Sequence, residues 1–332
     1  MYKARKDIVF LLIGVAVCAL FTTVIWLTGG RLNHFRETLV EDQGFSWYYW
    51  KLPNPNAWTQ SSAWLSYAVH QLLSWLLILR AQRKKLVYTS TSLHQENVLS
   101  LILHTSFALW HLLQTHLFYD GLAQDVPVWS PQFSVIVILV VVMIIENDRR
   151  GVFFGYRAPL PTSAVQLMKK YHGLYFSWAT VYTFWFHPCE TTSGHLLGFF
   201  YTYLLLLQGS IFFTRAHLNT WWKLSLELIV IVHGSLVAYY QAGIGGFWPM
   251  FFLGFAALFV ITQMHGLNIS YHTKWIIFAA YLGMVLVTYN IRGWAKLEEP
   301  LRIPVIDYSL LFVLSWLTVG GLKLGRKLTS LN

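Results

Sequence analysis

The chain has 332 residues, of which 56% are hydrophobic and only 11% are charged, and its formal net charge is +10. A soluble domain has about a quarter of its residues charged, so this composition excludes an ordinary soluble protein. The basic residues are divided among many short loops, which argues against a nucleic-acid-binding surface and is typical of loops that face anionic lipid.

Ten long apolar segments follow one another along the chain, each near the roughly 20 residues that cross a bilayer as a helix. The predicted spans are 8–28, 60–80, 98–118, 132–147, 171–187, 195–213, 222–241, 246–264, 275–291 and 306–322. The loops are short and no alternating strand pattern is present, so only helices satisfy the backbone in lipid. We expect an all-α, polytopic integral membrane protein with about ten transmembrane helices and a single membrane-embedded domain over 1–332.

The distribution of Lys and Arg sets the expected orientation. With the N-terminus inside, the inner side, which begins with Lys3, holds 18 of the 24 basic residues, and the outer side holds six. The positive-inside rule then places both termini in the cytoplasm. The longest loops are an outer aromatic-rich stretch, 29–59, and an inner basic stretch, 148–170. We expect the protein in the cytoplasmic membrane of a bacterium.

Five histidines and carboxylates fall at the predicted outer ends of three spans. They are His116, Asp120, His187, Glu190 and His195. The first two lie four residues apart on one helical face, and the other three flank a short hairpin that Pro188 begins. Imidazole and carboxylate are ligands of zinc, iron and manganese. We predict that the five form a divalent-metal site; the alternative is that they are polar caps of helix ends.

Four further histidines lie within the predicted spans or at their inner ends, and they are candidates for binding a b-type haem. They are His104, His111, His172 and His233. The spans 98–118 and 171–187 run in parallel and each carries an inner and an outer histidine, which resembles membrane cytochromes b with two stacked haems. The helical phase favours a different pairing, because His104 and His111 share a face whereas His116 is rotated by about 120° from His104.

Other polar residues inside the spans are rarer and need a partner in lipid. His70 lies near the middle of its span, where an imidazole serves as an axial ligand, a proton relay or an interhelical hydrogen-bond donor. Glu227 is expected to pair with Lys223 one turn earlier. Asp307 begins the last predicted span and is expected to cap it.

These features predict a membrane-embedded, oxidoreductase-like enzyme that uses a metal or a haem near the outer face and acts on a lipid or quinone-like substrate. Two alternatives use the same residues differently. Buried histidines and Glu227 also suit a proton- or cation-coupled transporter. The aromatic-rich surface suits a non-catalytic membrane subunit of a larger complex. The expected partners are the lipid bilayer and a lipid or quinone substrate, and nucleic acid is not expected.

Overall fold

The computed structural model describes residues 5–44 and 47–329. Lys3, a predicted inner-side charge, lies outside these residues, as do Phe45 and Ser46 of the stretch 29–59. The part of the chain that the structure describes contains helices and isolated bridges but no strand. The all-α prediction is therefore confirmed.

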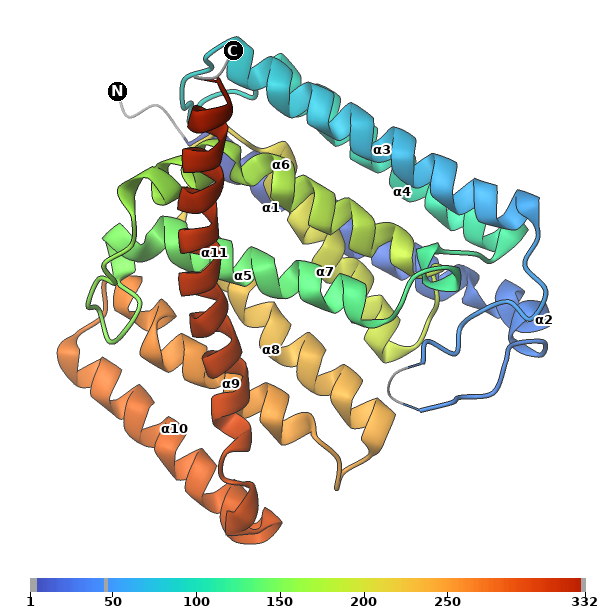
Figure 1. Ribbon diagram of the computed structural model, residues 1–332. Helices are drawn as coiled ribbons and strands as arrows, with labels where there is room; N and C mark the ends of the chain where they lie inside the picture. The colour runs from blue at the N-terminus through green and yellow to red at the C-terminus, as the bar shows by residue number, and fades with distance from the viewer. Residues whose placement is uncertain (1–4, 45–46, 330–332) are drawn as a thin grey trace. The chain divides into compact units, whose positions relative to one another are not determined.

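Eleven α-helices and four short 3₁₀ helices lie in the described residues (Figure 1). The α-helices are α1 (Lys6–Thr28), α2 (Asn33–Arg36), α3 (Ala57–Arg83), α4 (Gln95–Phe118), α5 (Trp129–Arg150), α6 (Thr162–Phe186), α7 (Ser193–Ser210), α8 (Thr220–Ala242), α9 (Trp248–Ile261), α10 (Tyr271–Arg292) and α11 (Glu299–Thr329). The 3₁₀ helices are η1 (Gly29–Leu32), η2 (Leu122–Gln124), η3 (Gln263–Gly266) and η4 (Trp294–Lys296). Each predicted span overlaps one of these α-helices, although 171–187 begins nine residues after the start of α6 and 195–213 extends three residues beyond α7.

Eight described helical segments are long and apolar enough to cross a membrane. They contain α1, α3, α4, α5, α8, α9, α10 and α11. Length and hydropathy thus support an integral membrane protein with several membrane-crossing helices.

The start of the last helix differs from the prediction. The helix α11 begins at Glu299, whose carboxylate accepts hydrogen bonds from Arg292 (2.9 and 3.1 Å) and from the Tyr289 hydroxyl (3.1 Å). Asp307, predicted to cap this helix, instead lies eight residues inside it and is buried. The ion pair between Glu299 and Arg292 stabilises the first turn of α11, which explains why the helix begins before the predicted apolar span 306–322.

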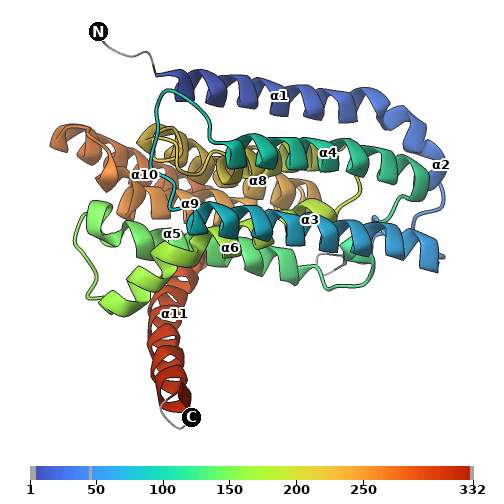
Figure 2. The same cartoon turned by 90° about the horizontal axis from the view of Figure 1, so that it is seen from above.

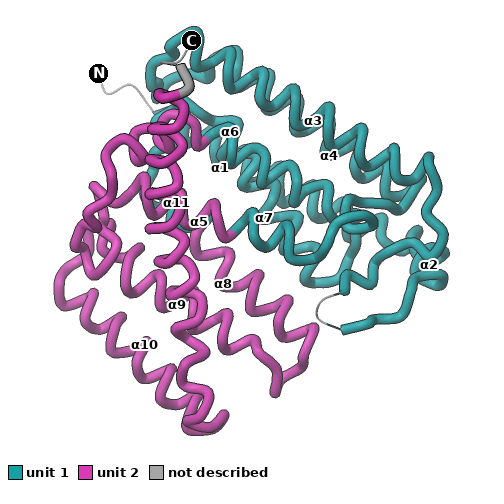
Figure 3. The backbone as a smooth tube through the Cα atoms, viewed as in Figure 1, with its two compact units in different colours: residues 1–135, 173–226 teal, residues 136–172, 227–332 magenta. Residues whose placement is uncertain are grey.

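The chain divides into two compact units, which Figure 3 shows in different colours. Unit 1 comprises Met1–Val135 and Gly173–Leu226, and unit 2 comprises Ile136–His172 and Glu227–Asn332. The division falls inside α5, α6 and α8. The division into compact units does not test whether the chain folds as a single domain, so the prediction of one membrane-embedded domain stays a prediction.

In unit 1, α3 and α4 form an antiparallel pair that lies side by side in both Figure 1 and Figure 2. Helix α7 contacts both α1 and α4. Gly14 makes the contact with α1 close, because a Cβ atom there would lie 2.6 Å from a methyl carbon of Leu207. The amide of Asn97, fully buried at the start of α4, donates to the Ser210 and Phe212 carbonyls at the end of α7 (2.8 Å each).

In unit 2, α9 packs against α10 and α11. Gly254 on α9 faces the side chain of Ile303, which a Cβ atom would approach to 3.0 Å. The Thr262 hydroxyl donates to the Val152 carbonyl (2.7 Å) and exchanges a hydrogen bond with the Tyr308 hydroxyl (2.7 Å). The loop after α5 is thereby tied to α9 and α11.

Candidate functional site

The interior of unit 1 contains a chain of three hydrogen-bonded side chains, Trp185, His70 and His104, which we call the imidazole chain. His70 is the middle residue of α3, and His104 lies inside α4. His70 Nε2 and His104 Nδ1 are 2.7 Å apart, and Trp185 Nε1 donates to His70 Nδ1 at 3.2 Å. His70 therefore joins two helices, one of the three roles that its position in the sequence indicates.

The imidazole chain has a defined hydrogen-bond direction. An indole N–H only donates, so His70 Nδ1 must accept. A neutral His70 then carries its proton on Nε2 and donates it to His104 Nδ1. The network thus assigns the proton of neutral His104 to Nε2, which has no hydrogen-bond partner within the described residues. His104 retains 9% of its surface exposed, so the chain presents one N–H donor.

His111 lies seven residues after His104 on α4, about two helical turns further along, and has different surroundings. Its ring is fully buried and lies 4.4 Å from the Trp185 ring, 4.6 Å from Phe184 and 5.7 Å from Phe199. Neither ring nitrogen has a hydrogen-bond partner among the described residues. The faces of these aromatic rings are weak acceptors for its N–H.

The four predicted haem ligands divide between the two units of the chain. Three aromatic rings lie within 5.7 Å of the His111 ring. His104 offers its open nitrogen as a protonated donor, whereas a metal ligand needs the lone pair. The other two candidates belong to unit 2, where His172 Nδ1 contacts the Lys169 carbonyl (2.9 Å) and His233 lies half-buried on α8.

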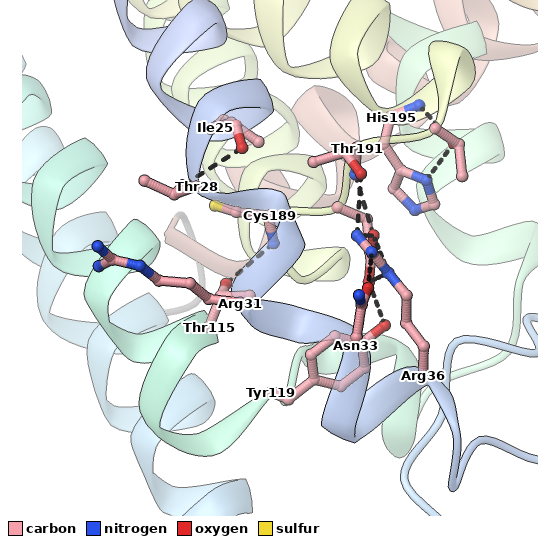
Figure 4. A network of polar contacts seen from close by, with 12 residues as sticks. Ile25, Thr28, Arg31, Asn33, Arg36, Thr115, Tyr119, Cys189, Thr191 and His195 are labelled. Carbon is pink, nitrogen blue, oxygen red and sulfur yellow. Dashed lines mark hydrogen bonds and ion pairs between the residues drawn. The ribbon is translucent and has the colours of Figure 1, made fainter.

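A second polar group of unit 1, the Glu190 clamp, consists of Arg36, Tyr119, Glu190 and Thr191 (Figure 4). The fully buried Glu190 carboxylate accepts from Arg36 Nη2 (2.7 Å), Arg36 Nε (3.2 Å to each oxygen) and the Tyr119 hydroxyl (2.6 Å). It also accepts from the Thr191 backbone N–H (3.0 Å). The clamp joins α2 to the end of α4 and to the loop after α6, and it leaves Glu190 no free coordination site.

Electrostatics and backbone geometry agree on the structural role of the clamp. Burial alone raises the pKa of the Glu190 carboxyl, but the hydrogen bonds from Arg36 and Tyr119 outweigh it, and the pKa lies below its usual range. Tyr119 ends α4 in the left-handed region, at φ 44°. A non-glycine residue pays a strain of order 1 kcal/mol there. The bond to Glu190 and a stacked contact with Phe35, at 4.8 Å between ring centroids, hold Tyr119 in place.

His195 and His187 lie beside the clamp with aromatic neighbours. His195 Nε2 is 2.8 Å from the Tyr48 hydroxyl, and its Nδ1 is 2.7 Å from Thr192 Oγ1. Thr192 also caps α7 by accepting from the His195 backbone N–H. The ring of His187 lies 5.3 Å from that of His195 and 4.9 Å from that of Tyr48.

The remaining two predicted metal ligands have partners in the backbone. His116 Nδ1 lies 2.8 Å from the Leu112 carbonyl and its Nε2 lies 3.3 Å from the Thr28 carbonyl. Asp120 accepts from the Gly121 N–H (2.7 Å).

The structure brings His187 and His195 together, whereas Glu190 pairs with Arg36 and Tyr119. His116 and Asp120 lie against backbone groups. No group of three or more His, Cys, Asp and Glu side chains within residues 5–44 and 47–329 is placed to hold a metal ion. The arrangement therefore does not support the predicted metal site. Arg36, Tyr48 and Tyr119, which sequence reasoning missed, are the partners that decide this. Tyr119 ends α4 and Thr192 caps α7, so the alternative that the five residues cap helix ends stays a prediction.

Unit 2 has polar groups in its own interior. Glu227 on α8 accepts two hydrogen bonds from Arg150 Nη1 (2.7 and 3.0 Å), a partner that the sequence analysis does not identify. Asp307 on α11 is 1% exposed, and its Oδ2 atom has no hydrogen-bond partner in the described part of the chain. An ionised carboxylate in that position costs several kcal/mol, so Asp307 needs a proton or a cation.

Comparisons with protein-family models, with curated proteins and with solved structures find no match to this chain.

Replacing Glu190 by Gln should lower the free energy of unfolding by roughly 1–3 kcal/mol, because Arg36 loses its charge-assisted partner. Denaturant unfolding of the purified protein in detergent measures the loss. Asn33→Ala is the control, since it removes only the exposed Asn33 oxygen that accepts from Arg36 Nη1. It should change the free energy by less than about 0.5 kcal/mol. Equal losses in the two variants would contradict the clamp.

The buried carboxyl of Asp120 should make the stability of the fold depend on pH. Burial raises the pKa of its carboxyl to about 6, against roughly 3.9 in an unfolded chain. Protonation therefore stabilises the fold; this gain is complete below about pH 3.9 and is lost as the pH rises through about 6. Asp120→Asn keeps an acceptor for Gly121 and removes the titration. The variant should melt above the wild type at pH 8, with the difference closing near pH 4. A difference independent of pH would refute this.

Proposed function

We propose that unit 1 binds a membrane-soluble carbonyl compound of the quinone class at His104, and that the protein is the membrane-embedded part of an oxidoreductase. The observation that carries this proposal is the imidazole chain. It ends in the N–H of His104, which has no partner among the described residues. Its two imidazoles lie on α3 and α4, which are both long and apolar enough to cross a membrane.

The charge of the imidazole chain favours a neutral ligand. Each lone pair in the chain already accepts a hydrogen bond, from Trp185 at His70 and from His70 at His104. A further proton would break one of these bonds, so both rings stay neutral. An anion gains little from a neutral donor in an apolar interior, whereas a carbonyl oxygen needs one hydrogen bond only.

The depth of the donor separates a quinone from a glycerolipid. The donor His104 lies 9 residues from the start of α4 and 14 from its end, and its partner His70 lies 13 residues from each end of α3. At 1.5 Å per residue these separations are about 14–21 Å. The hydrocarbon layer is about 30 Å thick, so ester carbonyls stay about 15 Å from its centre. A quinone head group dissolves in the hydrocarbon and reaches this level. Of the two expected substrate classes, the geometry therefore favours the quinone, at mid-helix rather than near the outer face.

The source of electrons follows from the fit of the predicted cofactors. A zinc, iron or manganese site at His116, Asp120, His187, Glu190 and His195 is not supported by the arrangement of these side chains. The open nitrogen of His104 carries a proton, whereas a haem iron needs a lone pair. We therefore assign electron delivery to a partner protein. The chain then serves as a quinone-binding membrane subunit. This role combines the expected oxidoreductase function with the expected role as a membrane subunit of a larger complex.

Removal of the donor tests this proposal. His104→Leu should weaken saturable binding of tritiated decylubiquinone to the protein in nanodiscs by about tenfold or more, because the quinone oxygen loses its donor in an apolar site. His172→Leu, a change in unit 2, should leave the dissociation constant unchanged. The proposal fails if the wild type shows no saturable binding, or if His104→Leu binds as tightly as the wild type.

The membrane topology belongs to the same proposal: ten helices cross the cytoplasmic membrane of a bacterium, with both termini in the cytoplasm. The basic residues, 18 inside against six outside, support this orientation. Both native cysteines are buried, so labelling of added cysteines has a low background. In intact cells, a membrane-impermeant maleimide should label Asn54→Cys and Ala295→Cys but not Arg157→Cys, at three exposed positions. Outside labelling of Arg157→Cys would rule out ten crossings.

A second candidate function, proton- or cation-coupled transport, rests on Asp307. Its buried, unpartnered oxygen is a binding site for a proton or a small cation. In proteoliposomes that contain a pH-sensitive dye, wild-type protein should then dissipate an imposed proton or sodium gradient, and Asp307→Asn should abolish the flux. Ser315→Ala is the control on the same helix, because the Ser315 hydroxyl bonds only the Leu311 carbonyl of α11. Absence of flux in the wild type would refute transport.

A further inference from the structure

We infer that Trp185 selects the redox form of the ligand: it makes the site bind the oxidised, carbonyl form in preference to the reduced, hydroxyl form. This inference rests on the proposed function and deepens it. Trp185 is a positioning residue, because it acts on the ligand only through His70 and His104.

Without Trp185, the His70–His104 hydrogen bond runs in either direction. In one direction His70 donates and His104 keeps its proton on Nε2. In the other, His104 Nδ1 donates to His70 Nε2, and His104 Nε2 becomes an acceptor. The indole N–H at His70 Nδ1 excludes the second direction, because it would place two protons in one 3.2 Å contact.

The indole itself cannot turn away. Trp185 has no exposed surface. The His111 ring lies at 4.4 Å and 33° to it, the Phe184 ring at 5.4 Å and 88°, and the Phe107 ring at 6.2 Å and 84°. Phe107 also stacks on His70 at 4.2 Å and 4°. These contacts fix both partners of the Trp185–His70 bond, and they give the buried His111 a role in holding the indole.

Redox selection follows from the fixed N–H at His104. A quinone oxygen only accepts, so it pairs with this donor. A quinol presents a hydroxyl, whose oxygen is a weaker acceptor and whose proton needs an acceptor in turn. His104 has no lone pair left for that proton, and an unpaired buried donor costs about tenfold or more in affinity.

Two measurements on the same variants test this inference. The first is the ¹⁵N NMR spectrum of histidine-labelled protein without ligand, in which the His104 signals are assigned by their loss in His104→Gln. The second is anaerobic binding of decylubiquinone and decylubiquinol. The wild type should show His104 protonated at Nε2 and should bind the quinone at least about tenfold more tightly than the quinol.

Trp185→Phe should give His104 a mixture of both tautomers and reduce the preference for quinone to within about threefold. Trp178→Phe is a matched control, because this residue lies on the same helix and its indole N–H donates to the Tyr67 hydroxyl (3.0 Å) outside the imidazole chain. It should retain the wild-type tautomer and preference. If Trp185→Phe does not fold, His70→Phe should release His104 in the same way while preserving the stack on Phe107.

The results of these measurements distinguish the role of Trp185 from quinone binding at His104. An unchanged His104 tautomer in both Trp185→Phe and His70→Phe overturns the role of Trp185, even if quinone binds. A wild type in which His104 is protonated at Nε2 but neither decylubiquinone nor decylubiquinol binds overturns the proposed function instead. Equal affinity of the wild type for the two forms overturns redox selection.

Discussion

The hydrogen bond between His70 and His104 is the interaction on which the interior of unit 1 depends. An apolar surrounding offers a polar side chain no substitute for water, so the imidazole on α3 and the imidazole on α4 have to satisfy each other. Their pairing sets the register of the two helices, and the indole of Trp185 brings α6 to the same point. These hydrogen bonds therefore connect three helices and leave the N–H of His104 as the unused donor of the imidazole chain.

The Glu190 clamp applies the same rule at the ends of the helices. A carboxylate with no exposed surface is stable because four donors surround it, and the strained backbone of Tyr119 is held because its hydroxyl is one of them. Gly121 completes this junction. A Cβ atom there would lie 2.6 Å from the Phe186 carbonyl oxygen, so the chain after α4 approaches the end of α6 as closely as only glycine allows.

The helices were predictable because apolar length is a local property of the sequence. The spans 60–80 and 98–118 needed only extension at their ends to become α3 and α4. Partners were not predictable, because they depend on which helices meet. Glu190 pairs with Arg36, 154 positions earlier in the chain. The spacing of histidines and carboxylates therefore indicated a metal site. In the fold, the Glu190 carboxylate instead binds the guanidinium of Arg36 and the phenol of Tyr119. His70 was noticed for its depth, but Trp185 was one of 16 tryptophans with no local signal.

The neutrality of the imidazole chain has an electrical consequence. A membrane voltage does work only on charge, about 2.3 kcal/mol for each elementary charge moved across 100 mV. Two uncharged rings and an uncharged ligand carry none of that charge. If a neutral quinone binds at His104, as proposed, its occupancy would therefore not depend directly on the membrane potential. In a respiring cell the site would respond to how much ligand the bilayer holds, and not to how strongly the membrane is energised.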